Sequence, residues 1–253
     1  MAYIDTPDGY TFDEAIASRM GPAGEFSNLD DGQKLLFLRF LVANPDYMET
    51  PPPGFTGTNE KYLTVPMSPY MAGLRAKVDV EEGWHCSASN RRIIGVEGLD
   101  VDLTFNLGDE NCEVNMLNAK GIVTAVNLNG IKEWGNYSTG FPGNTGVDAF
   151  ECVRRTRAIM KRAIEAACVQ FLDRNIRPAH IDLVRNTVQQ YLNGLVGQDK
   201  ILYGKCFYRP EHNPPAQLST GHVQFDNEFT PAIPMQRMTF TYKFDLEQLT
   251  NLK

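Results

Sequence analysis

The stretch DAFECVRRTRAIMKRAIEAACVQFLDR, from Asp148 to Arg174, decides the fold. Apolar residues recur in it at spacings of three, four or seven, which is the pattern of one face of an α-helix. This stripe consists of Phe150, Val153, Met160, Ile164, Ala167 and Phe171. We therefore expect a long helix from Asp148 to about Arg174, packed through the stripe.

A second helix is expected directly after the first, from Pro178 to about Leu195. It carries Ile181, Val184, Val188 and Leu192 on one face, and Gly194 and Gly197 follow where a helix commonly ends. Strand-like segments come next, at residues 205–209, 222–227 and 237–244. This order of a helix pair followed by strands indicates an α+β fold.

Upstream, the sequence predicts several strands and a hairpin. The β-branched run Ile122–Val126 and the segment Ile131–Trp134 flank Asn129-Gly130, a dipeptide suited to a two-residue turn. The apolar run Leu35–Val42 is short enough to be one buried strand. Residues 93–99 are also strand-like, and Val101, Leu103 and Phe105 alternate as in a further strand.

Three shorter helices are expected in the same region, each with a recognisable start or end. They are residues 12–20 with Thr11 as the cap, residues 68–77 with Ser68 as the cap and Pro69 at the first position, and residues 114–118 ended by Lys120-Gly121. The proline- and glycine-rich stretch 51–57 cannot sustain a helix or a ladder, so we expect a surface excursion there. We divide the chain into a partial or reduced α/β domain at residues 1–64 and a core domain at residues 65–253.

Composition and charge exclude several classes of protein. Hydrophobic residues make up 42% and charged residues 22% of the 253 positions, as in an ordinary globular protein. The net charge of −7 argues against a general nucleic-acid binder. Residues 1–74 hold ten acidic and four basic residues, so most of the negative charge lies there. The sequence shows neither an apolar run of about 18 residues nor a signal peptide, and we expect synthesis in the cytoplasm.

No pattern of catalytic or metal-binding residues stands out. The five cysteines form no CxxC pair, and His180, His212 and His222 lack the spacing of a zinc motif. His85-Cys86 suggests a nucleophile, but neighbouring residues of a strand point to opposite faces, so we expect no catalytic pair. Trp84 and Trp134 are expected to anchor the core. The sequence therefore predicts no enzyme, no cofactor and no metal.

Several collinear segments together resemble the C-terminal region of contractile tail sheath proteins of myophages, a family related to the sheaths of R-type pyocins and type VI secretion systems. The segments are Ala72–Asp79, Gly83–His85, Ser89–Asn90, Gly95–Gly98, Leu117–Asn118, Gly121–Thr124 and Glu133–Asn136, followed by the helix pair and the proline-flanked final strand. The resemblance covers about residues 65–247, and 2–7 and 12–15 resemble the family's preceding domain. Such proteins begin with an N-terminal arm and a larger α/β region that this chain lacks, so it is a fragment or an unusually small sheath.

The resemblance implies a sheath core domain with a long helix pair and a small mixed sheet, plus part of a preceding α/β domain. It also implies a structural subunit that polymerises into a sixfold helical sheath around an inner tail tube and contracts to drive the tube through the host envelope. The partners would be other copies of the chain, the tube, the baseplate and the tail terminator, with no nucleic acid and no small-molecule substrate. The place of action would be the tail of the virion, after assembly in the host cytoplasm.

Two surfaces are expected to carry this role. Met238, Phe240, Tyr242 and Phe244 form one face of a final strand that would pair with another subunit, with Pro231 and Pro234 as a hinge before it. Its alternative is a last strand in the chain's own sheet. Arg154, Arg155, Lys161 and Arg162 would face an acidic tube, because Glu151–Arg174 holds six bases and three acids. The alternative there is a solvated helix face with local ion pairs.

Two other functions remain open from the sequence. The first is a phage-associated hydrolase or carbohydrate-active enzyme, which would need a pocket with clustered His, Asp and Cys side chains. The second is another structural subunit of the virion, in the capsid or the baseplate.

Overall fold

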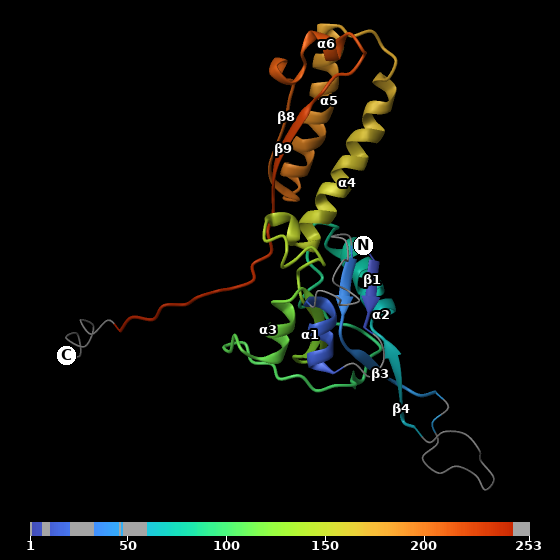
Figure 1. The fold of residues 1–253 in the computed structure, drawn as a ribbon, viewed down its shortest axis with the longest axis vertical. Coiled ribbons are helices and arrows are strands. Elements are labelled where there is room, and N and C mark those ends of the chain that lie inside the picture. The colour runs from blue at the N-terminus through green and yellow to red at the C-terminus, as the bar shows by residue number, and fades with distance from the viewer. Residues whose placement is uncertain (1, 7–10, 21–32, 46, 48–59, 245–253) are drawn as a thin grey trace, which may run out of the picture.

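The structure is a computed structural model that describes residues 2–6, 11–20, 33–45, 47 and 60–244. It combines helices and sheets, as the α+β expectation requires (Figure 1). Among the described residues, a body (residues 2–149) holds two sheets and three α-helices. An arm, residues 151–231, holds the long helix pair and a separate two-stranded ribbon. The predicted surface excursion at 51–57 lies outside the described residues.

The body is built on a four-stranded mixed sheet with the order β1-β2-β6-β7. Its strands are β1 (Ala2–Asp5), β2 (Gln33–Leu36), β6 (Ile122–Asn127) and β7 (Ile131–Trp134). The first three strands run parallel, and β7 returns antiparallel to β6. Asn129 and Gly130 both have positive φ, at 54° and 109°, so the predicted Asn-Gly hairpin is confirmed.

The apolar run Leu35–Val42 does not form one strand, and that prediction was wrong. It divides into β2 and β3 (Arg39–Ala43), which belong to different sheets. The second sheet has the order β4-β3-β5, with β4 at Tyr62–Pro66 and β5 at Gly98–Leu99. Phe37 and Leu38, between the two strands, are buried, which explains why the hydrophobic pattern continues through the break. The strand expected at 101–105 is also absent, because these residues follow β5 as irregular chain.

The three helices of the body match the predicted positions with one correction. They are α1 (Phe12–Met20), α2 (Ser68–Glu81) and α3 (Glu113–Asn118). Thr11 caps α1 as predicted: its Oγ1 accepts the Glu14 backbone N–H at 3.3 Å, and the Thr11 N–H donates to Glu14 Oε2 at 2.8 Å. Ser68 does not cap α2, because the helix already includes it and Met67 stands at the cap position. The carboxylate of Asp5 instead accepts the N–H groups of Met67 and Ser68, at 3.0 and 3.1 Å.

The predicted helix pair forms the arm. Helix α4 spans Glu151–Cys168 and α5 spans Pro178–Gly197, with single 3-10 turns at Val147–Ala149 (η1) and Val169–Phe171 (η2) replacing the expected ends of α4. The ribbon pairs β8 (Ile201–Phe207) antiparallel with β9 (Asp226–Pro231). A 3-10 turn at Pro210–His212 (η3) and the short α6 (Pro215–Leu218) lie between the two strands.

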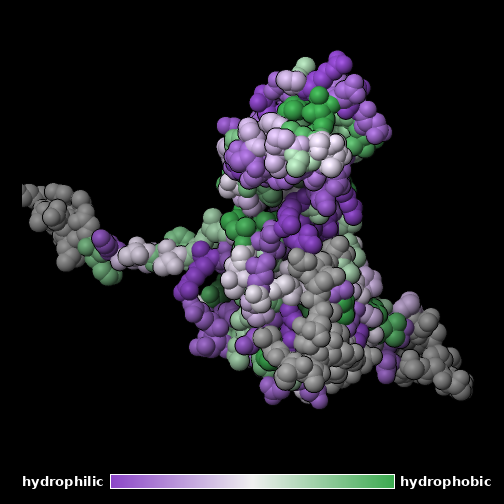
Figure 2. Space-filling view, turned by 45° about the horizontal axis from the view of Figure 1, so that its top comes forward, coloured by the Kyte–Doolittle hydropathy of each residue, from purple (hydrophilic) through white to green (hydrophobic). Residues whose placement is uncertain are grey.

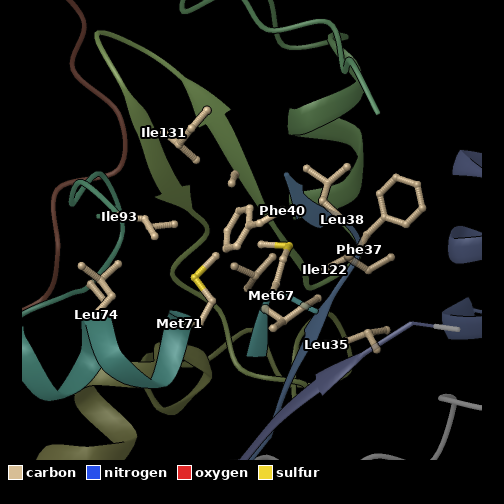
Figure 3. Packing of buried hydrophobic residues seen from close by; sticks show 14 of the residues in the cluster. Leu35, Phe37, Leu38, Phe40, Met67, Met71, Leu74, Ile93, Ile122 and Ile131 are labelled. Carbon is tan, nitrogen blue, oxygen red and sulfur yellow. The ribbon is translucent and has the colours of Figure 1, made fainter. Parts of the chain in front are cut away.

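Each part has its own hydrophobic core. In the body, Phe40, Met67, Met71 and Ile122 are fully buried where the two sheets and α2 meet (Figure 3). In the arm, Met160 of α4 packs with Val188 and Leu192 of α5 and with Ile201 and Cys206 of β8. The strand β2 pairs with β6, so the four-stranded sheet joins residues on both sides of the boundary that the sequence suggested at residue 64. That boundary stays a prediction.

Candidate assembly surfaces

After β9, residues 232–244 form the C-terminal segment. This segment leaves the arm as an extended chain without a partner strand among the described residues (Figures 1 and 2). Its expected apolar row is strongly exposed: Met238 at 66%, Phe240 at 70%, Tyr242 at 87% and Phe244 at 94%. A row of large apolar side chains in water is unfavourable and commonly marks an interaction surface. Among the described residues this segment is therefore not part of the chain's own sheets, and its pairing with another subunit stays a prediction.

Two side-chain contacts attach the beginning of the segment to the body after it has left the arm. Tyr137 Oη donates a hydrogen bond of 2.8 Å to Gln236 Oε1, and Arg237 Nη2 lies 2.5 Å from Glu110 Oε1. The Tyr137 ring stacks on Phe141 with 4.0 Å between the ring centres. The beginning of the segment is thus attached to the body, while the residues from Met238 onward extend beyond it.

The β8-β9 ribbon is the second incomplete element. The two strands pair from Ile201 with Pro231 to Phe207 with Asp226. A two-stranded ribbon is only marginally stable alone, and an exposed edge can accept a further strand. Of the two expected hinge residues, Pro231 is buried at the end of β9, and only Pro234 lies in the irregular chain that follows.

The expected basic face of α4 divides into two parts. The guanidinium of Arg155 pairs with Asp79 of α2, and its Nε lies 3.9 Å from Glu151 Oε1. Arg155 is therefore engaged with the body, and Arg154 next to it is half-buried. Lys161 and Arg162, one to two turns further along, are exposed, and Lys161 lies 3.7 Å from Glu165. The structure thus leaves Lys161 and Arg162 as the exposed basic residues of the original four.

Sequence reasoning missed a buried cluster of charges at the junction of arm and body. Lys34 Nζ lies 2.7 Å from Glu133 Oε1 and 3.2 Å from Glu151 Oε2. Arg75 Nη1 of α2 lies 3.7 Å from the same Glu151 oxygen, and Arg75 Nη2 lies 2.7 Å from Asp79 Oδ1. Together with Arg155, the cluster has three basic and three acidic side chains, so its formal charges balance.

A signal for this cluster was present in the sequence. Lys34 directly precedes a run of four apolar residues, and Glu133 lies two positions after Ile131 in the expected strand, so the two share one face. A charged residue at an inward-facing strand position is rarely buried unless it is paired. The partners could not be identified in advance because they come from four separate elements, β2, β7, α2 and α4.

Burial and neighbouring charges move the pKa values of the cluster in different directions. Burial raises the pKa of the Glu133 carboxyl, and the attraction of Lys34 only partly opposes that effect. Burial also acts on Glu151, but Lys34, Arg75 and Arg155 outweigh it and lower the pKa of this carboxyl. Burial would lower the pKa of Lys34, but Glu133 and Glu151 raise it. The carboxylate of Glu151, in the first turn of α4, is therefore surrounded by three cationic side chains, those of Lys34, Arg75 and Arg155.

His85 and Cys86 lie close together, but the directions of their pKa shifts oppose a catalytic pair. The expectation that these side chains point apart was wrong, because residues 83–86 form a turn and His85 Nε2 lies 3.5 Å from Cys86 Sγ. Burial nevertheless raises the pKa of the Cys86 thiol and lowers that of His85, which opposes a thiolate–imidazolium pair. Within the described ranges no group of three potential ligands could hold a metal ion, and no helix is long and apolar enough to cross a membrane.

The two tryptophans pack as the sequence predicted. Trp84 contacts the core of the arm, and Trp134 packs edge-to-face on Phe105 with 4.9 Å between the ring centres. A hollow of about 350 Å³ beside α2 and one of about 400 Å³ beside β8 are open to the surface. All five cysteines are free thiols.

Comparison with known proteins identifies the relatives of the chain. No protein-family model matches the sequence. The tail sheath protein of Burkholderia phage BcepMu is 33% identical over 257 residues, which cover 100% of this chain and 51% of that protein. The major tail sheath protein of Serratia phage KSP20 is 30% identical over 189 residues, which cover 75% of this chain and 46% of that protein. The chain thus spans about half the length of the curated relatives it matches.

Solved structures of contractile particles contain the same fold. A chain of the anti-feeding prophage helical sheath in its contracted state matches with a TM-score of 0.72 at 16% identity, over 96% of this chain and 61% of that chain. A chain of the PVC sheath complex, from an extracellular contractile injection system in its contracted state, matches with a TM-score of 0.71 at 19% identity, over 98% of this chain and 64% of that chain. Over its whole length the chain is therefore homologous to part of the tail sheath proteins of phages, and it has the fold of the matching part of contractile sheath subunits.

Proposed function

We propose that the chain acts as a structural subunit of a contractile tail sheath, which polymerises around an inner tail tube and contracts to drive the tube through the host envelope. The single observation that carries the proposal is the apolar row from Met238 to Phe244, which extends from a chain homologous to tail sheath proteins with 66% to 94% of each row side chain exposed. An exposed row of large apolar side chains commonly marks a surface that another molecule covers.

The segment is proposed to add to the β8-β9 ribbon of another copy. Backbone hydrogen bonds would give strength to such a contact, and the alternating apolar side chains would determine its register. The ribbon suits this role because it has only two strands in the described part of the chain. Pro234 lies between ribbon and segment and is the proposed hinge, so the arm can rotate while its strand stays attached to a neighbour.

The exposed bases of α4 are proposed to face the tube. Lys161 and Arg162 keep their side chains in solvent, whereas Arg155 is engaged in the body. Exposed charges interact weakly and are screened by salt. Such a contact would align subunits on an acidic tube and still release them during contraction.

The other partners follow from the same proposal. The sheath would be a sixfold helical polymer that ends on a baseplate and a tail terminator, in the tail of the virion after assembly in the host cytoplasm. It would need no cofactor and catalyse no reaction, since a lattice of subunits can release energy when it rearranges into a more stable packing. The raised pKa of the Cys86 thiol supports the absence of thiol catalysis at this position.

Electron microscopy and sedimentation of the purified full chain test this proposal. We expect hollow cylinders or rings from the parent protein at high concentration. Phe240→Glu with Tyr242→Glu should abolish them, because charges would be placed in the apolar row. The matched control, Thr239→Glu with Thr241→Glu, changes the opposite face of the same strand and should assemble. A parent protein that stays monomeric at every concentration would contradict the proposal, as would equal loss of assembly in both double variants.

A further inference from the structure

The side chain of Gln189 occupies the outer edge of β8 like a short piece of a neighbouring strand. Its Oε1 accepts the backbone N–H of Cys206 at 3.0 Å, and its Nε2 donates to the carbonyl oxygen of Gly204 at 3.1 Å. One acceptor and one donor for residues two positions apart are what an added strand would supply. The same Nε2 also donates to Asn193 Oδ1 at 2.8 Å, which holds the amide in place on α5.

The alternation of a strand identifies which edge remains open. The backbone groups of Gly204 and Cys206 face Gln189, so those of Tyr203, Lys205 and Phe207 face β9. Their partners in β9 are Thr230, Glu228 and Asp226. The backbone groups of the intervening Asn227 and Phe229 must then point away from β8, and in the described part of the chain no other group hydrogen-bonds them. The ribbon thus has one occupied and one open edge.

Glycine at position 204 permits this arrangement. A Cβ atom there would lie 3.1 Å from Leu192 Cβ and 3.0 Å from Ile201 Cδ1, closer than such atoms ordinarily pack. The absence of a side chain therefore lets α5 approach β8 closely enough for Gln189 to reach the strand backbone. Gly204 and Gln189 together close the β8 edge.

The edges of β8 and β9 also differ in the charge of the side chains beside them. The hollow beside β8 is lined by Arg185 and Lys205, whereas β9 carries Asp226 and Glu228. Arg209 lies next to both of these acids, and His212 Nδ1 lies 2.6 Å from Asp226, so their charge is partly offset. Glu228 is still half exposed. Within residues 238–244 of the C-terminal segment the charged side chain is Lys243, which fits an acidic edge better than a basic one.

We propose that Gln189 blocks strand addition at β8 and thereby directs residues 238–244 of a second copy to the open edge of β9. The inference rests on the proposed strand exchange and specifies its edge. An unprotected edge strand pairs with whatever extended chain it meets, so covering one of two edges converts a symmetrical ribbon into one with a single docking edge. Gln189 is accordingly a specificity-determining residue for assembly and takes no part in holding the arm to the body.

Photo-crosslinking in the full chain tests the choice of edge. A benzophenone side chain replaces Tyr242, and the crosslinked peptides are identified by mass spectrometry. In the parent protein we expect intermolecular crosslinks to residues 226–231. Gln189→Ala should add crosslinks to residues 201–207, and Gln190→Ala, an exposed neighbour on the same helix, should not. Gln189→Glu, which keeps the acceptor for Cys206 and loses the donor for Gly204, serves as a milder second variant and should show the same change in smaller measure.

The possible results distinguish a failure of the edge assignment from a failure of the proposed strand exchange. Parent crosslinks to 201–207, or identical patterns in Gln189→Ala and Gln190→Ala, would overturn the edge assignment and leave the strand exchange standing. A lack of intermolecular crosslinks in all proteins would remove the strand exchange and this inference with it. Amide hydrogen exchange gives an independent reading: the Cys206 N–H should exchange about tenfold faster in Gln189→Ala than in Gln190→Ala, because it loses its acceptor. Equal exchange rates would contradict the blocking role.

Discussion

The ammonium of Lys34 and the carboxylate of Glu133 lie 2.7 Å apart, and both side chains are fully buried. Their strands, β2 and β7, are not neighbours, because β6 lies between them in the sheet. The pair therefore bridges the face of β6 and meets Glu151, at the start of α4, 3.2 Å from the ammonium. In this way buried charges join the sheet of the body to the first turn of the arm.

Removing the central cation should destabilise the protein strongly. Lys34→Met would leave Glu133 and Glu151 buried without their shared partner, and breaking a buried pair costs about 3–5 kcal/mol. Urea unfolding of the full chain measures the change. Lys161→Met, an exposed lysine on α4, is the control and should leave the unfolding midpoint almost unchanged. Similar midpoints for the two variants would show that the cluster contributes little to stability.

The two glutamates that face Lys34 should respond to pH with opposite sign. The pKa of Glu151 is lowered by folding, so the unfolded chain binds more protons and the contribution of Glu151 to stability is lost as the pH falls below about 4.5. The pKa of Glu133 is raised, so the folded chain binds more protons and stability decreases as the pH rises above about 4.5.

The matched variants Glu151→Gln and Glu133→Gln test this difference. Relative to the parent protein, Glu151→Gln should be most destabilised near pH 7 and less so near pH 4. Glu133→Gln should gain stability relative to the parent protein near pH 7, because ionisation of the buried Glu133 carboxyl destabilises the parent protein as the pH rises. Urea unfolding at both pH values gives the comparison, and two variants with the same pH dependence would be evidence against the assigned directions.

Gly121 and Gly73 should give opposite results when each is replaced by alanine. Gly121 ends the turn after α3 with a φ of +76°, and a Cβ there would lie 2.5 Å from the carbonyl oxygen of Phe141. Gly121→Ala should therefore cost roughly 1–3 kcal/mol of stability. Gly73 lies within α2, where a Cβ would meet nothing within 4 Å, so Gly73→Ala should stabilise the helix by about 0.5–1 kcal/mol. Thermal unfolding compares the two, and destabilisation by both would contradict the second assignment.

The exposed bases of α4 should govern binding to the tube without affecting the fold. Lys161→Glu with Arg162→Glu should weaken cosedimentation with purified inner tail tubes at low salt, and the difference should shrink at high salt. Lys77→Glu with Lys120→Glu, two bases of the body, should bind like the parent protein. Unchanged binding in the α4 variant would remove the proposed dock. Arg155→Glu does not suit this test, because it would disturb the pairing with Asp79 and the fold with it.

The thiols should be slow to react in the folded protein. Burial raises the pKa of Cys152 and that of Cys206 to about 11, and also raises that of Cys86. Alkylation by iodoacetamide at pH 7 should therefore be slower than for free cysteine at all three positions, and faster at pH 9. Urea should restore ordinary rates. Rapid modification of Cys86 at pH 7 would instead revive the enzyme alternative.

Local patterns predicted much of the fold because they depend on neighbours in sequence. The stripe through Met160 and Ile164 identified α4, the Asn129-Gly130 turn identified the β6-β7 hairpin, and Thr11 marked the start of α1. The errors arose where tertiary contacts decide. Leu35–Val42 has a continuous apolar pattern, yet it serves two sheets, since Phe37 and Leu38 are buried between them. Ser68 resembles a cap, but Asp5 is positioned by β1 to take that role.

The sequence by itself determined the helix pair, the hairpin and the alternating C-terminal segment, because periodicity and turn chemistry operate over a few residues. Its resemblance to tail sheath proteins rested on collinear segments and did not depend on the tertiary structure. Only the tertiary structure decided which charged side chains pair with one another. Glu133 and Glu151 lie 99 and 117 residues from Lys34 along the chain, and no local pattern reports that they meet. Arg155 could not be assigned to the body, nor Gln189 to the edge of β8, before the fold brought Asp79 and Cys206 to them. Electrostatic and backbone contacts depend on distance in space, and folding alone establishes that distance.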